Sequence, residues 1–396
     1  MFNIKDIDSD FVIVTIFTIV LLFIFDRISK MMFDKNEIKD FNNNDLLEFP
    51  ENYDFKNILD INEKNVLYQT LKDFVERYHD YNFIVSLSGG VDSMVLLYLL
   101  LRVTTTDKIA SASINYNQRE ESAAELKFIE KYLKNYNLVP YSRTVLGVSR
   151  KKENSNRKQF EETSQKIRYE LYNDILVDKN WTNKNTIILL GHHLDDLREN
   201  IFNNFMLGRK LLDLEVMSEI CEKEDLYFGR PFLNYSKSEI YNISHKCNIP
   251  YFKDTTPDWS KRGLMRRQLF PLLQQIYPGF EMKLDKQGNE SLCLKNLIEG
   301  EYIKNFLKVI EVKIVEDGTE FSWDRIYDIK VSNPIIWREL VSTILHKSGY
   351  KMVSQKSFKI FLENKLSNKL SNKYYMMSKN VGFKRLKDKT YLLLKK

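Results

Sequence analysis

The sequence predicts an α/β fold, an open parallel sheet flanked by helices, followed by a helical region with a small sheet. Three observations predict it. Short apolar runs alternate with helical patterns between residues 62 and 207, two of these runs end in polar turns, and the alternation stops after about residue 280. Alternating strands and helices are typical of parallel sheets, in which ligands bind at the carboxyl ends of the strands. The two polar turns are therefore the first candidates for a functional site.

The elements of the predicted sheet domain follow from the spacing of their apolar residues. Residues 83–87 (FIVSL), for example, form a continuous apolar run of the kind found in a buried parallel strand. Helices are expected over 62–79, 91–102, 122–136, 159–176 and 195–207, and strands over 83–87, 108–115, 138–145 and 186–191. The C-terminal region is expected to hold helices over 292–310, 333–348 and 355–366 and a strand over 390–394.

Length and composition fit a folded protein of two or three domains. The chain has 396 residues, of which 43% are hydrophobic and 29% charged, and this profile excludes a disordered chain. The net charge of +6 is unevenly placed, because residues 351–396 hold 13 Lys and Arg against 2 acids. Such a basic segment predicts contact with a polyanion. Cys221, Cys247 and Cys293 lie far apart, which excludes a disulfide framework or a CxxC-type metal site built from this chain and favours a reducing compartment.

Residues 11–25 are a candidate membrane anchor. These 15 residues carry no charge, although a spanning helix needs roughly 17–25 apolar residues. A cleaved signal peptide fits poorly, because the residues before the segment are mainly acidic. Arg27 and Lys30 follow it, which places the body on the cytoplasmic or organelle-matrix side. The alternative is a buried helix or strand pair. We expect three parts, namely an extension over 1–45, a sheet domain over 46–280 and a basic C-terminal region over 281–396.

The turn at residues 88–93, Ser-Gly-Gly-Val-Asp-Ser, joins a strand to a helix in the manner of an anion-binding loop. Two glycines let the backbone approach an anion, and the helix presents free N–H groups and the positive end of its dipole. Ser88 and Ser93 add hydroxyl donors, whereas Asp92 would repel a phosphate unless Mg²⁺ bridges the two. The alternative is a tight turn whose glycines serve packing. The loop lacks the G-K-[ST] of a Walker A motif and the third glycine of a dinucleotide-binding motif.

The second turn, at residues 191–200, concentrates two histidines and two aspartates at the end of a predicted strand. Asp195 and Glu199 are four residues apart and share one face of the helix that follows. Carboxylates at this spacing indicate a metal site, with Mg²⁺ favoured over zinc. The alternative is a capping turn, in which Asp195 or Asp196 begins the helix.

The first turn resembles the PP-loop of the ATP pyrophosphatases, which cleave ATP to AMP and pyrophosphate. The whole pattern resembles one family among them, the tRNA(Ile)-lysidine synthases. The second signature of that family, approximately G-H-H-x-D-D-x-x-E-T, matches residues 191–200 except at Asn200. Further stretches agree in the same order over about residues 60–275, namely 113–120, 167–172, 230–243, 250–254 and 262–273. Tyr116 and Gly263 depart from the histidine and asparagine usual in the family.

The resemblance implies an ATP-dependent ligase that modifies tRNA. Members of the family join lysine to carbon 2 of the wobble cytidine in tRNA(Ile) with a CAU anticodon. The reaction passes through an adenylylated cytidine and yields lysidine, AMP and pyrophosphate. The implied substrates and cofactors are therefore ATP, Mg²⁺, lysine and this tRNA.

The resemblance also implies roles for individual residues. ATP is expected on Ser88, Gly89, Gly90, Val91, Asp92 and Ser93, and Mg²⁺ on Asp92 or Asp195. The implied catalytic residues are Asp92, Arg168, His192, Asp196, Arg262 and Arg266. Asp196 is the candidate to accept the proton of the lysine amine, and the arginines would grip phosphate or the activated base. Further candidates are Arg119, His193, Asp195 and Glu199. For each arginine the alternative is a surface ion pair.

The basic tail is a candidate tRNA-binding surface. Its central residues Lys384, Arg385, Lys387 and Lys389 are expected to lie along the phosphate backbone and to give salt-dependent affinity. The alternative is a solvated run of charges, because the whole sequence is rich in lysine.

Two other functions stay open. A PP-loop enzyme that thiolates tRNA usually needs paired cysteines or an iron–sulfur cluster, and the spacing of the three cysteines disfavours it. A non-catalytic, membrane-tethered RNA-binding relative would account for the departures at Tyr116 and Gly263. Such a relative has no need of two intact polar turns.

Overall fold

The computed structural model describes residues 53–395 apart from 117–121, 146–153, 215–216, 253, 255, 257, 317, 325–332 and 367–370. All of these residues belong to the unit Phe49–Lys396, the second of two into which the chain divides. The candidate anchor at 11–25 lies outside the described residues, so its structure stays a prediction. Within the described ranges, no helix has the length and apolar character that crossing a membrane requires.

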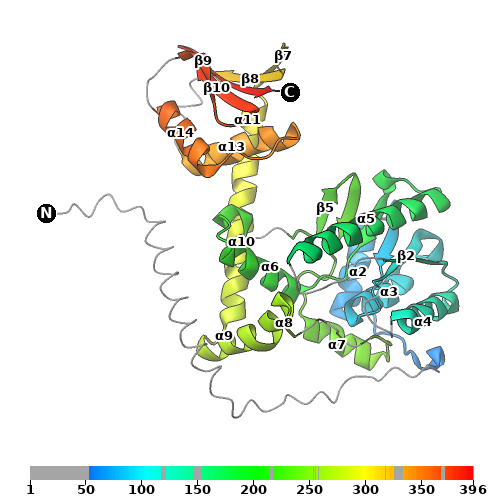
Figure 1. The fold of residues 1–396 in the computed structure, drawn as a ribbon. Helices are drawn as coiled ribbons and strands as arrows, with labels where there is room; N and C mark the ends of the chain where they lie inside the picture. Colours follow the sequence, from blue (N-terminus) through cyan, green and yellow to red (C-terminus); the bar gives the residue numbers. More distant parts are fainter. Residues whose placement is uncertain are drawn as a thin grey trace. The chain divides into compact units, whose positions relative to one another are not determined.

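A six-stranded sheet with the strand order β3-β2-β1-β4-β6-β5 forms the centre of the body (Figure 1). Its strands are β1 (Asn82–Ser86), β2 (Ile109–Asn115), β3 (Pro140–Thr144), β4 (Thr186–Leu189), β5 (Ile220–Lys223) and β6 (Leu226–Gly229). All neighbours are parallel except β5 and β6, which form an antiparallel hairpin at one edge. The predicted parallel α/β sheet is confirmed, and the hairpin is an addition that the sequence pattern did not predict.

Helices cover both faces of this sheet, as Figure 1 shows. They are α2 (Val66–Arg77), α3 (Val91–Val103), α4 (Ser122–Asn135), α5 (Asn154–Asp178), α6 (Leu194–Met206) and α7 (Lys237–Lys246). Residues of β1 alternate between two cores, because successive side chains of a strand point to opposite faces. Phe83 and Val85 pack with α2, α3 and α4 in one core, and Ile84 packs with α5 in the other.

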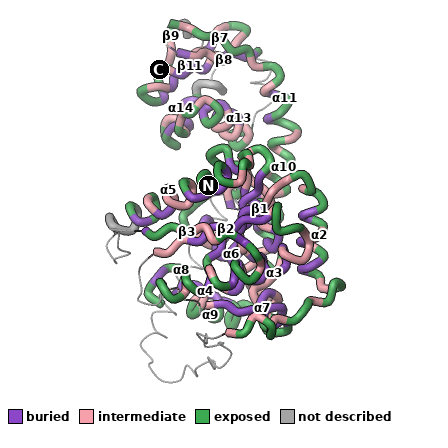
Figure 2. The backbone as a smooth tube through the Cα atoms, turned by 90° about the vertical axis from the view of Figure 1, so that its right-hand side faces the viewer, coloured by how far each residue is buried: buried purple, intermediate pink, exposed green. Residues whose placement is uncertain are grey.

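Helix α3 is buried nearly all round, unlike the other helices of the body (Figure 2). Its run from Met94 to Leu100 has no exposed residue. A helix that is apolar on every side belongs in a core. The first turn of α3 is therefore held rigidly against the end of β1, where the glycine-rich turn lies.

A helical stretch leads from the body toward the C-terminus. It contains α8 (Lys261–Leu264), a π-helical turn η6 (Met265–Leu269), α9 (Phe270–Ile276), α10 (Phe280–Leu297), a second π-helical turn η7 (Ile298–Ile303) and α11 (Lys304–Leu307). Helix α10 packs against α6. The predicted helix over 292–310 corresponds to the end of α10 with η7 and α11.

The C-terminal region contains a second, antiparallel sheet with the order β7-β8-β11-β10-β9. Its elements are β7 (Glu311–Val315), β8 (Gly318–Asp324), α13 (Pro334–Lys347), α14 (Gln355–Leu366), β9 (Ser371–Met376), β10 (Val381–Arg385) and β11 (Lys389–Lys395). Trp323, Trp337 and Phe361 form the centre of its own core. The predicted helices with a small sheet are confirmed, while the exact domain boundaries stay a prediction.

Candidate active site

The glycine-rich turn connects β1 to α3 and is braced by its two serines. The Ser88 N–H donates to Ser93 Oγ at 3.2 Å, and the Gly90 N–H donates to Ser88 Oγ at 3.3 Å. Ser93 Oγ in turn donates to the Gly90 carbonyl at 3.0 Å. Gly90 is the N-cap of α3 and offers no side chain to the free N–H groups of the first turn. Those N–H groups are the ones that an anion can bind.

Two glycines are required by close packing around this turn. Gly89 has a φ of +81°, and a Cβ there would lie 2.3 Å from the Phe252 ring. The Phe252 N–H donates to the Gly89 carbonyl at 2.9 Å, so a distant segment fixes the turn. A Cβ on Gly191 would lie 3.0 Å from Asp92 Cβ. The turn after β4 therefore lies directly against the start of α3.

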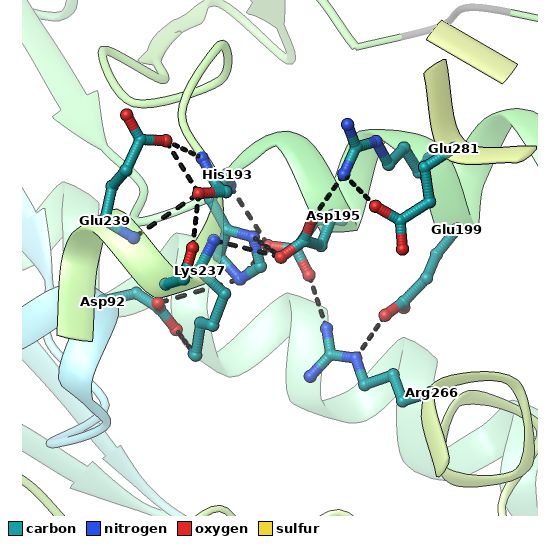
Figure 3. Close-up of polar contacts among 12 residues, drawn as sticks. Asp92, His193, Asp195, Glu199, Lys237, Glu239, Arg266 and Glu281 are labelled. Carbon is teal, nitrogen blue, oxygen red and sulfur yellow. Dashed lines mark hydrogen bonds and ion pairs between the residues drawn. The ribbon is translucent and has the colours of Figure 1, made fainter. Parts of the chain in front are cut away.

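Asp92 in the first turn of α3 is paired with Lys237 of α7. Lys237 Nζ donates to Asp92 Oδ2 at 2.5 Å, and the His193 Nε2 lies 3.7 Å from Asp92 Oδ1 (Figure 3). Oδ1 is buried and accepts no hydrogen bond from any described residue. An unsatisfied carboxylate oxygen in a buried position is costly. Asp92 is therefore suited to bind a further cation or donor.

His193 is the N-cap of α6 and is 2% exposed, with three aspartates around it. Its ring nitrogens lie 3.4 Å from Asp196, 3.7 Å from Asp92 and 3.8 Å from Asp195. Its backbone N–H donates to Asp196 Oδ2 at 3.2 Å. Burial lowers the pKa of His193, although the surrounding carboxylates oppose this effect. His193 thus lies buried between Asp92 of the first turn and the two aspartates at the start of α6.

Asp196 and Glu199 on α6 hold two arginines from the α8–η6 segment. Arg266 donates to Asp196 at 2.7 Å and also pairs with Glu199, and Arg262 bonds Glu199 at 2.8 Å and also pairs with Asp196. Figure 3 shows Arg266 lying between α6 and its own helix. Burial alone would raise the pKa of Asp196, but His193, Arg262, His192 and Arg266 together lower it. Arg266 also lies 3.5 Å from Asp254.

His192 lies at the end of β4 and is half-buried. Burial, its largest influence, lowers the pKa of His192 to about 4. Arg230 Nε donates to His192 Nδ1 at 3.2 Å. The imidazole is therefore neutral at physiological pH.

Asp195 is occupied by two donors on different elements. Its Oδ1 accepts from Arg198 at 3.0 Å, and its Oδ2 accepts from the backbone N–H of Lys237 at 3.0 Å. Arg198 also bonds Glu281 and Asp285 on α10, and Figure 3 shows Glu281 beside Asp195. Asp195 thus joins the start of α6 to the start of α7.

Of the two aspartates expected to hold Mg²⁺, Asp92 offers the better fit. In the described part of the chain, no three His, Cys, Asp or Glu side chains are grouped closely enough to hold a metal ion. Mg²⁺, however, is usually bound by one or two carboxylates together with substrate phosphates. Asp92 has an oxygen available for this role, whereas both oxygens of Asp195 already accept hydrogen bonds.

The remaining predicted residues fall outside this cluster. Arg119 is not among the described residues. Arg168 lies on α5, where its Nε donates to the Ser164 carbonyl of its own helix at 3.3 Å. Asn200 accepts from Asn204 at 2.8 Å, and the N–H of the buried Gly263 donates to Ser260 Oγ at 3.0 Å. The Asn200 contact lies within α6, and Gly263 makes its contact through the backbone alone.

The predicted tRNA-binding residues lie on and beside the hairpin of β10 and β11. Lys384 lies 4.5 Å from the Tyr374 ring centre and 3.2 Å from Glu320. Arg385 is 6% exposed, Lys387 is exposed and Lys389 pairs with Glu311. Their role in tRNA binding stays a prediction.

Two positions were missed by sequence reasoning, namely Lys237 and Arg230. Both lie in the stretch 230–243, which agrees with the family pattern without revealing what its charged residues contact. Lys237 is brought to Asp92 and Arg230 to His192 only by the folding of the chain.

Comparison with known proteins places the body in a known family. The family described as PP-loop domain matches residues 63–273, just over half of the chain. The chain is 30% identical over 220 residues to a tRNA(Ile)-lysidine synthase of Thermotoga maritima, a match that covers 54% of this chain and 51% of that protein. It is 26% identical over 235 residues to a tRNA(Ile)-lysidine synthase of Enterococcus faecalis, covering 58% of this chain and 48% of that protein. The matches thus span about half the length of these curated relatives.

Among solved structures, the chain is similar to the U34-tRNA thiolase NcsA of Methanococcus maripaludis with its [4Fe-4S] cluster. The identity is 16% and the TM-score 0.42, with 59% of this chain and 79% of that chain covered.

Proposed function

Since the chain belongs to the PP-loop domain family, we propose that it uses ATP to join lysine to carbon 2 of the wobble cytidine in tRNA(Ile) with a CAU anticodon. The products are lysidine in the tRNA, AMP and pyrophosphate. The observation that carries the proposal is the meeting of the two polar turns, because a Cβ on Gly191 would lie 3.0 Å from Asp92. The turn proposed to bind ATP and the cluster of charged residues proposed for catalysis therefore lie together. The choice of tRNA(Ile) and lysine as substrates follows from the relatives, which are tRNA(Ile)-lysidine synthases.

ATP would bind at the first turn of α3. The free N–H groups that follow Gly90, the hydroxyls of Ser88 and Ser93 and the backbone of Gly89, which carries no side chain, suit the phosphates. Asp92 would hold Mg²⁺, which neutralises phosphate charge when it is bound. Lys237 already provides a cation at Asp92, and we expect it to contact the same phosphates.

The first chemical step activates a poor electrophile. The 2-carbonyl oxygen of the cytidine attacks the α-phosphorus of ATP, and pyrophosphate leaves with the electrons of the broken bond. The oxygen becomes part of a good leaving group. Negative charge develops on the departing phosphates, and preorganised cations stabilise such charge. Arg262 and Arg266, held by Asp196 and Glu199, are the cations proposed for this purpose.

The second step forms the new carbon–nitrogen bond. The uncharged lysine amine attacks carbon 2, AMP leaves with the oxygen, and the nitrogen gives up a proton. Asp196 is the proposed proton acceptor. Its lowered pKa keeps it ionised at neutral pH, and the two arginines that lower the pKa also limit its basicity. We therefore expect Asp196 to orient the arginines as much as to take the proton.

An assay with the full chain tests the proposal. The protein is mixed with ATP, Mg²⁺, tRNA(Ile) bearing CAU and labelled lysine or labelled sulfide in parallel. We expect lysine-dependent release of AMP and pyrophosphate and label from lysine in the tRNA. The same tRNA with a uridine at the wobble position is the control and should stay unlabelled. Label from sulfur in place of lysine would identify a thiolating enzyme, and tRNA binding without any AMP would identify a non-catalytic relative.

We also propose that residues 11–25 anchor the chain in a membrane. Their 15 uncharged residues support it. Extraction of membranes with alkaline carbonate should leave the full chain in the pellet, and a variant without residues 11–25 should be released. Release of the full chain would refute the anchor. The proposed reaction would not be affected by that result.

A further inference from the structure

Arg230 and His192 are brought together by neighbouring strands. β4 and β6 are parallel partners, and the Leu190 N–H after β4 donates to the carbonyl of Gly229, the last residue of β6, at 2.9 Å. Residues that follow parallel neighbours emerge at the same edge of a sheet. Arg230 therefore lies beside His192 because of the fold, although 38 residues separate them.

The hydrogen bond between them has only one chemically allowed direction. Arg230 Nε lies 3.2 Å from His192 Nδ1, and a guanidinium has donors but no acceptor. Nδ1 must therefore carry a lone pair and no proton. A neutral imidazole has one protonated nitrogen, so the proton of His192 is on Nε2.

The guanidinium is itself held in place at its other end. Arg230 Nη1 donates to the Ser218 carbonyl at 3.0 Å and lies 3.3 Å from Cys221 Sγ. The Arg230 N–H also donates to the Glu219 carbonyl at 2.8 Å. Both the backbone and the side chain of Arg230 are thus fixed by β5 and the two residues before it, which leaves the planar guanidinium little freedom to turn away from His192.

We propose that Arg230 is a positioning residue that holds His192 as its Nε2–H tautomer, so that the imidazole acts as a hydrogen-bond donor to an oxygen of the substrate. The inference rests on the proposed function and deepens it. Within the described part of the chain, His192 Nε2 makes no hydrogen bond, so this donor is left for a ligand. The acceptor is a carbonyl or phosphoryl oxygen, the two kinds that the proposed reaction offers.

Other groups near His192 agree with a neutral donor. Its electrostatic neighbours are Asp196, Arg230, Arg262 and His193, and burial outweighs the attraction of Asp196 in lowering its pKa. A base at this place would need the Nδ1 lone pair or a free Nε2 lone pair. The first is taken by Arg230 and the second is protonated.

Nitrogen NMR of the full chain tests the tautomer without any assay. The chain has five histidines, so selective ¹⁵N-histidine labelling gives few signals, and His192→Gln identifies the one to follow. We expect His192 Nδ1 to have the shift of an unprotonated ring nitrogen and Nε2 that of a protonated one at neutral pH. Arg230→Met should mix or invert the tautomers. Arg143→Met is the matched control, because Arg143 on β3, at the other side of the sheet, forms an exposed ion pair with Asp174. A protonated Nδ1 in the unaltered chain would overturn the proposal.

A pair of amide substitutions tests the use of the donor. The amide of Gln reaches the position of Nε2 and that of Asn the position of Nδ1, so His192→Gln keeps the donor and His192→Asn loses it. Removal of one donor to a developing oxyanion typically costs about 10²–10³ in kcat. We expect His192→Asn to lose about that factor and His192→Gln to lose less than about tenfold, with similar KM for ATP. Equal losses in the two variants would overturn the donor role. If neither the unaltered protein nor the variants show any turnover, the proposed function is wrong. The NMR measurement still tests the tautomer of His192 in that case, because it needs no activity.

Discussion

Arg198 and Asp285 form a two-point ion pair, with Nε 2.8 Å from Oδ1 and Nη2 2.6 Å from Oδ2. The pair joins α6, which bears the candidate catalytic residues, to α10, which leads toward the basic C-terminal region. Arg198 is only 9% exposed, and it also bonds Asp195 and Glu281. A planar guanidinium with its donors satisfied by three carboxylates fixes geometry well. Because the same guanidinium bonds Asp195 and two carboxylates of α10, α10 helps to orient Asp195.

Replacing this arginine should destabilise the protein. Arg198→Met leaves three carboxylates without their shared donor, and hydrogen bonds to charged groups are worth about 1.5–3 kcal/mol each. We expect the free energy of unfolding to fall by about 2–3 kcal/mol, measured by urea denaturation with an unchanged slope. Lys166→Met is the control, because Lys166 pairs with Glu170 on an exposed helix face and such pairs contribute about 0.3–0.5 kcal/mol. Equal effects in the two variants would mean that the network around Arg198 does not hold the helices.

The burial of His192 should make stability depend on pH. Its pKa is about 4 in the folded protein, against 6.5 for an unperturbed histidine, so the unfolded chain takes up a proton first as pH falls. Stability is then lost progressively from about pH 6.5 down to about pH 4 and the loss ends below that, when the folded state is protonated too. The slope contributed is at most about 1.4 kcal/mol per pH unit. His192→Gln should lack this contribution. The test is the difference between the unfolding free energies of the two proteins across that range, and a constant difference would contradict the pKa shift.

Asp92 should be needed for turnover and not for tRNA binding. Asp92→Asn removes the charge that pairs with Lys237 and the oxygen proposed for Mg²⁺. We expect AMP release to fall by at least about 10², and the Kd for tRNA at fixed salt to stay within about threefold, a change of under 1 kcal/mol. Asp107→Asn, an exposed aspartate beyond the far end of α3, is the control for the loss of one charge. A large loss of tRNA affinity would show that Asp92 has a different role.

Gly89 should tolerate a side chain far less well than Gly208. Both have a positive φ, of +81° and +66°, which costs a non-glycine residue about 1–2 kcal/mol. A Cβ at Gly89 would also lie 2.3 Å from Phe252, whereas nothing lies within 4 Å of one at Gly208. Gly89→Ala should therefore lower stability by about 1–3 kcal/mol more than Gly208→Ala, the usual cost of overpacking. Thermal unfolding measures both, and equal shifts in Tm would argue against the tight packing of the turn.

Much of the body could be predicted from sequence because its signals are local. β1, the glycine turn and α3 are continuous in the chain, so apolar runs and glycines define them. The β5–β6 hairpin was missed because its turn residues Glu224 and Asp225 have φ of +51° and +60° without the glycine or asparagine that usually mark such a turn. Its two strands have four residues each, and β5 ends in the charged pair Glu222 and Lys223. The hairpin belongs to the sheet because β6 pairs with β4.

The site was predictable in part for the same reason. His192 and Asp196 belong to one short motif, whereas Arg230 and Lys237 act on residues far away in sequence. The burial of Arg385 could have been predicted from sequence. Val381, Phe383 and Arg385 alternate along β10 and therefore share its buried face. Charge composition drew attention to the basic cluster, but strand periodicity decides which of its side chains reach solvent.

Lys387 and Lys389 should contribute to tRNA affinity in a salt-dependent way. Lys387 is exposed, and Lys389 is paired with Glu311 on the edge strand β7, where a phosphate can compete for it. Each phosphate contact that is lost reduces the slope of log affinity against log salt by roughly one. The double variant Lys387→Met/Lys389→Met should therefore bind tRNA(Ile) more weakly at low salt and with a slope smaller by about one to two. Lys166→Met in the body is the matched loss of an exposed lysine and should leave the slope unchanged. If the double variant and this control behave alike while both still release AMP, tRNA is bound by another surface. The net charge of +11 over residues 351–396 would then be only a solvated run of charges.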